Sequence, residues 1–361
     1  MIPIAKPMIG DEEIEAATRV LKSGRLAQGP EVERFEQEFA EYIGVDHAIA
    51  VSNGTVALQC AMSATGISRP SNRSNHRVVH TTAFSFVSSA TSIRAVQAQV
   101  KFEDIVLSTY GMRPLSYLDV VQGDGALVVH LYGHPAYIPH VGGLPFVEDC
   151  AQSIGSMYNG RKVGSFGDAG AFSFYATKNI TSGGEGGMVT TNHQHVADAA
   201  RLYRNHGDVW KYQHVVPGTN GRMTELQAAV GRVQLRKIDR FTSRRRSNAQ
   251  YYNEHIDQSW LVLPREAEDC YHTYHQYVVR VREDAPVTRQ QFIAILAEAG
   301  VGCAVHYPTI IPAQRIFGIY DLSEYQNALL AARTVVSIPV GPWVTDADRE
   351  HIVEVINGIS E

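Results

Sequence analysis

Lys178 is a candidate reactive lysine, because neither charge pairing nor packing obviously requires a lysine at its position. Lys178 lies in the stretch FSFYATKNITSGGEGG, after an alternating aromatic run and before a segment with four glycines in five residues. An uncharged lysine amine attacks carbonyl groups, and burial or a neighbouring cation lowers its pKa enough to free it. A surface lysine that reaches into solvent is the alternative, so the surrounding residues decide.

The stretch SNGT, residues 52–55, is a candidate phosphate cradle. It ends a short apolar run and opens a helical pattern. The N–H groups of Gly54 and Thr55, with the Thr55 hydroxyl, can hold a phosphate at such a helix N-terminus. A helix cap without any ligand gives the same pattern, so this stretch alone does not decide.

Three further side chains follow predicted strands. Phe86 comes after the run VVHTTAFS, Asp149 ends PFVED, and Ser173 lies near the end of AGAFSF. Ligands of open α/β sheets bind beyond the carboxyl ends of the strands, which predicts that these residues meet at one edge. Taken singly, Phe86 suits a core position and Asp149 suits a helix cap.

Together, a phosphate cradle, an aromatic side chain, a carboxylate and a lysine match the needs of pyridoxal phosphate. Its aldehyde forms a Schiff base with a lysine amine. Its ring nitrogen requires a carboxylate partner to stay protonated, so that the ring acts as an electron sink. Other nucleotide motifs are missing: GSMYNGRK lacks the Lys-Ser/Thr ending of a P-loop, and GSFGDAG lacks dinucleotide-fingerprint spacing.

The elements that must position these residues alternate along the chain. Short apolar strands, HAIAVS, VVHTT, ALVVHLYG, PFVED, AGAFSF and GMVTT, are separated by helical stretches. This alternation predicts an α/β fold with a mostly parallel central sheet flanked by helices. Asp11 is predicted to cap a first helix that has Ile14, Ala17 and Leu21 on one face, and Pro30 to begin a second.

The C-terminal part predicts a smaller unit. One long helical pattern runs from Thr224 towards Tyr252, and the strand HQYVVRVR, a helix from Thr288 and two last helices follow. We expect a large cofactor-binding α/β domain over residues 1–245. A small α+β domain is expected over residues 246–361.

Composition excludes several classes of partner. The net charge of −5 gives no electrostatic case for nucleic acid or an anionic membrane. No run of about 18 apolar residues is present, so no membrane span is expected. The four cysteines form no C-x-x-C pair, which favours a reduced, cytoplasmic protein. His130, His134 and His140 lie close in sequence, but Gly133 and Pro135 break any helix that would align them, so no metal site is expected.

These residues lie within motifs that resemble the DegT/DnrJ/EryC1/StrS family of sugar aminotransferases, which have fold type I of pyridoxal phosphate enzymes. The resemblance covers nearly the whole chain. It is carried by the stretches GRLAQGPEVERFEQEFAEYIGVDHAIAVSNGTVAL, EDCAQSIGSMYNGRKVGSFGDAGAFSFYATKNITSGGEGGMV, NGRMTELQAAVGRVQLRKI and VHYP.

The resemblance implies roles for the residues nearest the cofactor ring. Lys178 would form the Schiff base and move the proton between substrate and cofactor. Asp149 would pair with the ring nitrogen. Gln152 would contact the cofactor's O3′ side, and Phe86 would stack on the ring.

The resemblance implies further contacts at the phosphate and the substrate. Gly54, Thr55 and Ser173 would bind the phosphate. Asn220 would reach it from the other subunit, so a homodimer with shared active sites is expected. His306 and Tyr307 would lie near the substrate.

The implied reaction moves an amino group from an amino acid, with L-glutamate as the expected donor, to a nucleotide-linked keto sugar. Such amino sugars enter surface polysaccharides or glycosylated natural products. One alternative is a sugar dehydratase of the same fold, but there histidine replaces the lysine. Another is a silent scaffold or regulator, which would be expected to lose Lys178 or Asp149.

Three features depart from the family pattern. Gly221 stands where relatives usually carry tyrosine, at the expected dimer interface. The connection over residues 133–145 is shorter than usual, and the loop over 68–77 is longer. The sugar, the nucleotide and the ring position therefore stay open.

Overall fold

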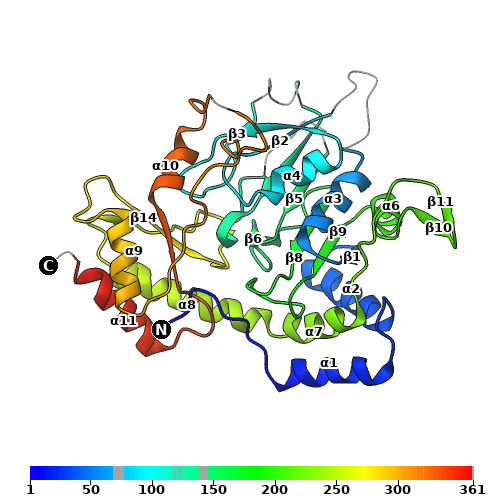
Figure 1. The fold of residues 1–361 in the computed structure, drawn as a ribbon, viewed down its shortest axis with the longest axis horizontal. Helices are drawn as coiled ribbons and strands as arrows, with labels where there is room; N and C mark the ends of the chain where they lie inside the picture. Colours follow the sequence, from blue (N-terminus) through cyan, green and yellow to red (C-terminus); the bar gives the residue numbers. More distant parts are fainter. Residues whose placement is uncertain are drawn as a thin grey trace.

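A seven-stranded sheet forms the centre of the larger part of the computed structural model (Figure 1). The structure describes residues 1–67, 77–116, 119, 121, 123–138, 145–319 and 321–359. In spatial order the strands are β1 (His47–Val51), β9 (Gly187–Thr191), β8 (Ala169–Ser173), β5 (Phe146–Asp149), β4 (Gly125–Val129), β2 (Val78–Thr82) and β3 (Gln99–Glu103). Only β9 runs antiparallel to its neighbours within this sheet, which confirms the predicted mostly parallel α/β fold.

Helices cover both faces of this sheet, and the strand sequences show why. In β1, Ile49 and Val51 pack on one face, whereas Ala48 and Ala50 pack on the other. A strand with apolar residues at every position must be covered on both sides. The first face carries α3 (Gly54–Ala64) and α6 (Gln194–Arg204), and the second carries α2 (Pro30–Ile43) and α7 (Glu225–Leu235).

The second face is packed by aromatic rings. Phe39 of α2 meets Phe172 of β8 edge-to-face, with ring centroids 5.0 Å apart. Phe39 also meets Phe174, with centroids 5.4 Å apart. Each fully buried Phe contributes on the order of 2 kcal/mol by leaving water. This packing fixes β8, and with it the chain that leads to Lys178.

Helix α1 (Asp11–Ser23) differs from its prediction at both its start and its faces. Gly10, not Asp11, is the N-cap, because the Glu13 carboxylate accepts from the Gly10 N–H at 2.9 Å and closes the first turn. The predicted apolar face is turned to solvent, since Ile14 is 57% exposed and Leu21 58%. The opposite face, Ala16 with Val20, packs on α7 instead.

The long helix predicted from Thr224 is two helices. Helix α7 ends at Leu235, and α8 (Ile238–His255) begins after a short break. The break is held from outside: Glu13 of α1 accepts from Gln234 and from Lys237, both at 2.7 Å. Local sequence cannot reveal a break that another helix holds in place.

A second, antiparallel sheet lies towards the C-terminal part (Figure 1). Its strands are β12 (Leu261–Val262), β14 (Tyr277–Val281) and β15 (Val335–Ile338), and the cluster packed with it draws on α8, α9 (Arg289–Glu298) and α11 (Asp346–Asn357). Ile2 pairs with Val301, so the N-terminal arm also joins this unit. A boundary at 245/246 would fall inside α8, and the division into domains stays a prediction.

Shorter elements complete the described chain. They are α4 (Ser88–Ala95), the 3₁₀ turn η1 (Leu131–Gly133), α10 (Gln326–Thr334), and the strands β6 (Met157–Tyr158), β7 (Arg161–Lys162), β10 (Asp208–Trp210), β11 (Gln213–His214) and β13 (Cys270–Tyr271). None of the described helices is long and apolar enough to cross a membrane. Residues 68–76 of the loop predicted to be long, and residues 139–144 of the 133–145 connection, lie outside the described residues.

Candidate active site

A cavity of about 730 Å³ opens at the carboxyl ends of the parallel strands. Residues that follow β1, β2, β4, β5 and β8 all face it, as the strand-edge argument predicts. Its lining includes most of the residues singled out from the sequence, namely Gly54, Thr55, Phe86, Asp149, Gln152, Ser173, Lys178, His306 and Tyr307. Asn220 is not part of this lining.

The start of α3 forms one end of the cavity. Asn53 caps the helix by accepting from the Val56 N–H at 3.0 Å, and no described hydrogen bond takes the N–H groups of Gly54 and Thr55. The Thr55 hydroxyl lies 3.0 Å from that of Ser88. Two free N–H groups and two hydroxyls at a helix N-terminus form an arrangement that suits a phosphate.

Gly54 is required there by close approach. A Cβ at position 54 would lie 2.7 Å from the Cβ of Ser173. Gly187, at the start of β9, is required in the same way, because a Cβ there would lie 2.4 Å from the Asn53 carbonyl oxygen. The glycines near Lys178 therefore bring β9 against the turn that precedes α3.

Asp149 is buried at the end of β5. Its Oδ2 accepts from the Ser89 hydroxyl at 2.7 Å, and its Oδ1 accepts from the Ala151 N–H at 3.1 Å. Burial raises the pKa of Asp149, although these two hydrogen bonds and the charge of Lys178 act in the opposite direction. A buried carboxylate of this kind is stabilised by a cationic N–H partner, which a protonated pyridine ring would provide.

Lys178 faces the same cavity from the turn after β8. Burial lowers the pKa of its amine to about 8, and the negative charge of Asp149 acts against that shift. About a tenth of the amine is therefore uncharged at pH 7, far more than for an ordinary lysine, and the uncharged form is the nucleophile. The Lys178 N–H donates to the Tyr175 carbonyl at 2.9 Å, which closes the turn.

A polar and aromatic wall, formed by Gln152, Tyr307 and Phe86, is another part of the cavity lining. Gln152 donates to the Tyr307 hydroxyl at 3.0 Å and accepts from the Tyr132 N–H at 2.7 Å. The rings of Phe86 and Tyr307 have centroids 6.1 Å apart. Phe86 is 54% exposed, which excludes the core alternative and leaves its ring free to stack on a ligand.

His306 adds an uncharged imidazole to this wall. Its Nδ1 lies 2.9 Å from the Ser337 hydroxyl. Burial lowers the pKa of His306 to about 4, and the nearby Lys178 contributes to that shift. The ring is therefore a neutral hydrogen-bonding group at physiological pH.

Three further residues of the cavity lining had no predicted role in this site: Ser89, His130 and His275. His130 directly follows β4, so its position at a strand end was a usable signal. Ser89 lies in the first turn of α4, and His275 precedes β14; only the folded chain brings these two to the cavity.

His130 also belongs to a buried cluster with Glu148 and Cys150, whose ligand-type atoms lie within 4.8 Å of one another. The Glu148 carboxylate already accepts from His130 Nε2 at 3.0 Å and from three backbone N–H groups of residues 164–167. His130 Nδ1 accepts from the Ala136 N–H at 2.9 Å. These contacts occupy both histidine nitrogens and both carboxylate oxygens, so the cluster is a structural network.

Asn220 lies on the outside of its own chain. Its backbone pairs with Asn205, and the next residue, Gly221, accepts from the Ser52 N–H at 2.8 Å. The side chain is exposed and does not line the cavity of its own subunit. Any role at a cofactor phosphate would therefore have to be played in a second copy.

The side chains that are present fit pyridoxal phosphate. The amine of Lys178, the buried carboxylate of Asp149 and the helix start at Gly54 all face one cavity, as an aldehyde, a ring nitrogen and a phosphate require. Phe86 and Gln152 line the same cavity. Each functional group of the cofactor has a matching group in the described residues.

Comparisons with known proteins agree with this chemistry. Residues 7–357 match the model of the DegT/DnrJ/EryC1/StrS aminotransferase family. The spore coat polysaccharide biosynthesis protein SpsC of Bacillus subtilis is 35% identical, over 99% of this chain and 97% of SpsC. The dTDP-3-amino-3,6-dideoxy-alpha-D-galactopyranose transaminase of Aneurinibacillus thermoaerophilus is 34% identical, over 95% of this chain and 94% of that protein.

A solved structure extends the similarity to the fold. DesV of S. venezuelae, in complex with a ketimine intermediate, superposes with a TM-score of 0.88 at 31% identity, over 97% of this chain and 94% of DesV. The family match and this superposition both span nearly the whole chain. The chain therefore belongs to the DegT/DnrJ/EryC1/StrS aminotransferase family.

Proposed function

We propose that this aminotransferase moves an amino group from an amino acid, L-glutamate, to a nucleotide-linked keto sugar. One observation carries the proposal: a single cavity brings the Lys178 amine, with its pKa lowered to about 8, together with buried Asp149 and the start of α3. The transaminase that acts on a dTDP-linked sugar and is 34% identical to this chain supports the substrate class. The product would serve amino-sugar biosynthesis, for polysaccharide or glycosylated natural products.

Pyridoxal phosphate, the cofactor of this family, supplies an aldehyde that takes up the amino group and a ring that stores electrons. Lys178 would hold the cofactor through its amine and could move a proton at Nζ, which its lowered pKa permits. Asp149 would keep the ring nitrogen protonated, and the Ser89 hydroxyl holds that carboxylate in place at 2.7 Å. Ser173, Gly54 and Thr55 would bind the phosphate.

The polar and aromatic wall would orient the cofactor ring and the sugar. Phe86 would stack on the ring, and Gln152 would contact its O3′ side. Gln152 is fixed by the Tyr132 N–H at 2.7 Å and by Tyr307 at 3.0 Å, so its amide does not need to reorganise on binding. We place His306 and Tyr307 at the substrate end of the cavity.

We also propose a homodimer in which each subunit gives Asn220 to the site of its partner. The exposed position of Asn220, outside its own cavity, supports this arrangement. The hairpin of β10 and β11 beside it presents Trp210, 73% exposed, and Tyr212, 81% exposed (Figure 1). Large exposed aromatic side chains are typical of surfaces that another chain covers.

We further propose that the protein works in a reducing compartment, the cytoplasm, and its four free cysteines support this.

The test is a visible absorbance spectrum of the protein with pyridoxal phosphate, recorded before and after L-glutamate is added. We expect a band of lysine-bound cofactor that disappears with glutamate, and turnover when nucleotide-linked keto sugars follow. Lys178→Ala should remove both the band and turnover while the protein stays folded. A normal band and normal turnover in Lys178→Ala would refute the proposal.

A further inference from the structure

The residue after the catalytic lysine makes a contact that the proposed chemistry does not use. Asn179 is buried, and its Oδ1 lies 2.9 Å from Nδ1 of His275. His275 stands 96 positions further along the chain, just before β14. The pair therefore links the turn that carries Lys178 to the segment that leads into the second sheet.

His275 is itself held firmly. Arg245 of α8 donates from Nη1 to the carbonyl oxygen of His275 at 3.1 Å and to that of Tyr274 at 3.2 Å. Arg245 is 2% exposed and His275 is 9% exposed, so water does not compete for these bonds. The imidazole is a fixed anchor for Asn179, because its backbone is tied to a buried guanidinium.

The protonation state of His275 follows from its neighbours. Burial lowers its pKa well below the ordinary value, and the nearby Lys178 and Arg245, with His306 and His272, act in the same direction. The ring is therefore neutral. An amide oxygen can only accept, so Nδ1 carries the ring proton and donates to Asn179.

We propose that the hydrogen bond between Asn179 and His275 is a positioning contact for Lys178. It fixes the turn directly after the lysine, so that the amine stays in the buried part of the cavity beside Asp149. Without the contact, the turn can relax towards solvent and the amine becomes more exposed. The inference rests on the proposed function in taking Lys178 as the reacting amine.

The two ring nitrogens of His275 can be replaced separately, which gives a matched pair of variants. His275→Asn places an amide N–H close to the position of Nδ1, whereas His275→Gln places it close to that of Nε2. The first variant keeps a donor for Asn179 and the second does not. Asn179→Leu removes the acceptor from the other side while keeping a side chain of similar size.

The readout is the pH dependence of Lys178 acylation in the cofactor-free protein, followed by mass spectrometry. In the wild type, labelling should report an amine with a pKa of about 8. In Asn179→Leu and His275→Gln the pKa of Lys178 should rise by about one unit or more, towards that of a free lysine. The uncharged fraction of the amine at pH 7 should therefore fall about tenfold. His275→Asn should resemble the wild type.

A second readout is the rate at which added pyridoxal phosphate produces the lysine-bound absorbance band. We expect it to fall about tenfold in Asn179→Leu and His275→Gln, with recovery in His275→Asn. Circular dichroism checks that each variant folds. If either Asn179→Leu or His275→Gln does not fold, the other one of these two variants provides the test. An unchanged pKa and rate in either folded variant, or equal loss in His275→Asn and His275→Gln, would overturn the proposal. A wild type without the band would contradict the proposed function instead, while the labelling comparison would still test the contact.

Discussion

At the scale of single residues, burial changes Lys178 and Asp149 in opposite directions. Desolvation disfavours the charged form of each, so it lowers the pKa of the lysine and raises that of the aspartate. Each charge opposes the shift of the other. The lowered pKa of Lys178 brings its amine closer to the range in which a side chain can give and take a proton near neutral pH.

Asp149→Asn should separate the two roles of this carboxylate. Loss of its negative charge removes the one contribution that raises the pKa of Lys178, so that pKa should fall below about 8 in the cofactor-free protein. Turnover should nevertheless fall about a thousandfold, equivalent to about 4 kcal/mol of transition-state stabilisation, because the ring nitrogen loses its partner. Lysine labelling measures the first effect and steady-state kinetics the second.

The matched control for Asp149→Asn is Asp198→Asn. Asp198 is paired with Arg201 on the surface of α6, at 3.0 Å, away from the cavity. It should alter neither the pKa of Lys178 nor turnover. A higher lysine pKa in Asp149→Asn, or unchanged kinetics, would show that another group faces the ring nitrogen.

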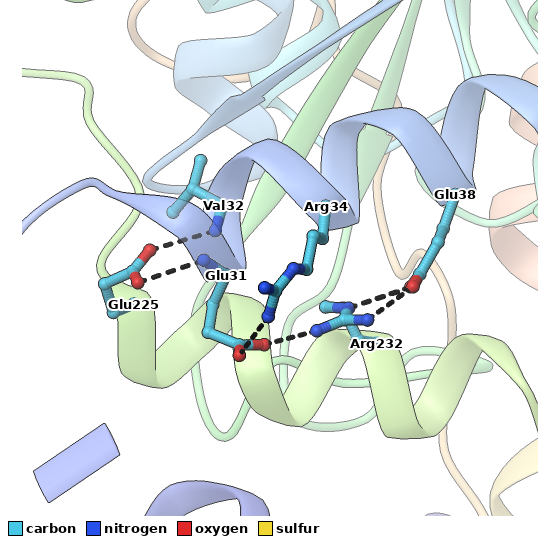
Figure 2. Close-up of polar contacts among 6 residues, drawn as sticks. All are labelled: Glu31, Val32, Arg34, Glu38, Glu225 and Arg232. Carbon is cyan, nitrogen blue, oxygen red and sulfur yellow. Dashed lines mark hydrogen bonds and ion pairs between the residues drawn. The ribbon is translucent and has the colours of Figure 1, made fainter. Parts of the chain in front are cut away.

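At the scale of elements, α2 and α7 are joined by charged contacts that cross between them (Figure 2). Glu225, at the start of α7, accepts from the N–H groups of Glu31 at 3.0 Å and Val32 at 2.9 Å, so it caps α2 from outside. Arg232 of α7 binds both Glu31 and Glu38 of α2. These contacts hold the helix layer behind β8 and Lys178.

Replacing Glu225 should destabilise the fold. Glu225 is 3% exposed, and Glu225→Gln keeps one acceptor oxygen but removes the charge that favours a helix N-terminus. We expect the free energy of unfolding in urea to fall by about 1–3 kcal/mol. Arg34→Met is the control: Arg34 is exposed, and among the described residues its side chain bonds only to Glu31 on its own helix, at 3.4 Å, so its loss should cost about 0.5 kcal/mol or less. Equal effects of the two substitutions would contradict the capping role.

Particular elements show what the sequence could and could not predict. Strands β1, β5 and β8 were predictable because apolar runs with polar ends determine both their position and the cavity edge. The break between α7 and α8 was not, because Glu13 of a distant helix holds it. Likewise, Asp149 ends β5 and Lys178 follows β8 closely along the chain, whereas Asn179 and His275 meet only through tertiary packing. Contacts set by local pattern are readable from sequence, and contacts set by packing between distant segments are not.

At the scale of the whole molecule, apolar surface remains on two separated elements. Ile14 and Leu21 of α1 are more than half exposed, and so are Val209, Trp210 and Tyr212 around the hairpin. In Figure 1 the hairpin of β10 and β11 projects from one end of the subunit. Patches of this kind favour association with a second copy. The proposed dimer would cover this surface and complete the site in the same step.

Subunit mixing tests whether the site is shared. Lys178→Ala lacks the amine, and Asn220→Ala lacks the residue proposed to act in the partner's cavity; each homodimer should have little activity. In a mixed dimer, one cavity combines the intact Lys178 of one chain with the intact Asn220 of the other. Random exchange after joint refolding should therefore restore about a quarter of wild-type turnover, because about half the dimers are mixed and each has one complete site. If Asn220 acts within its own chain, no mixed dimer contains a complete site, and the mixture should stay at the level of the separate variants.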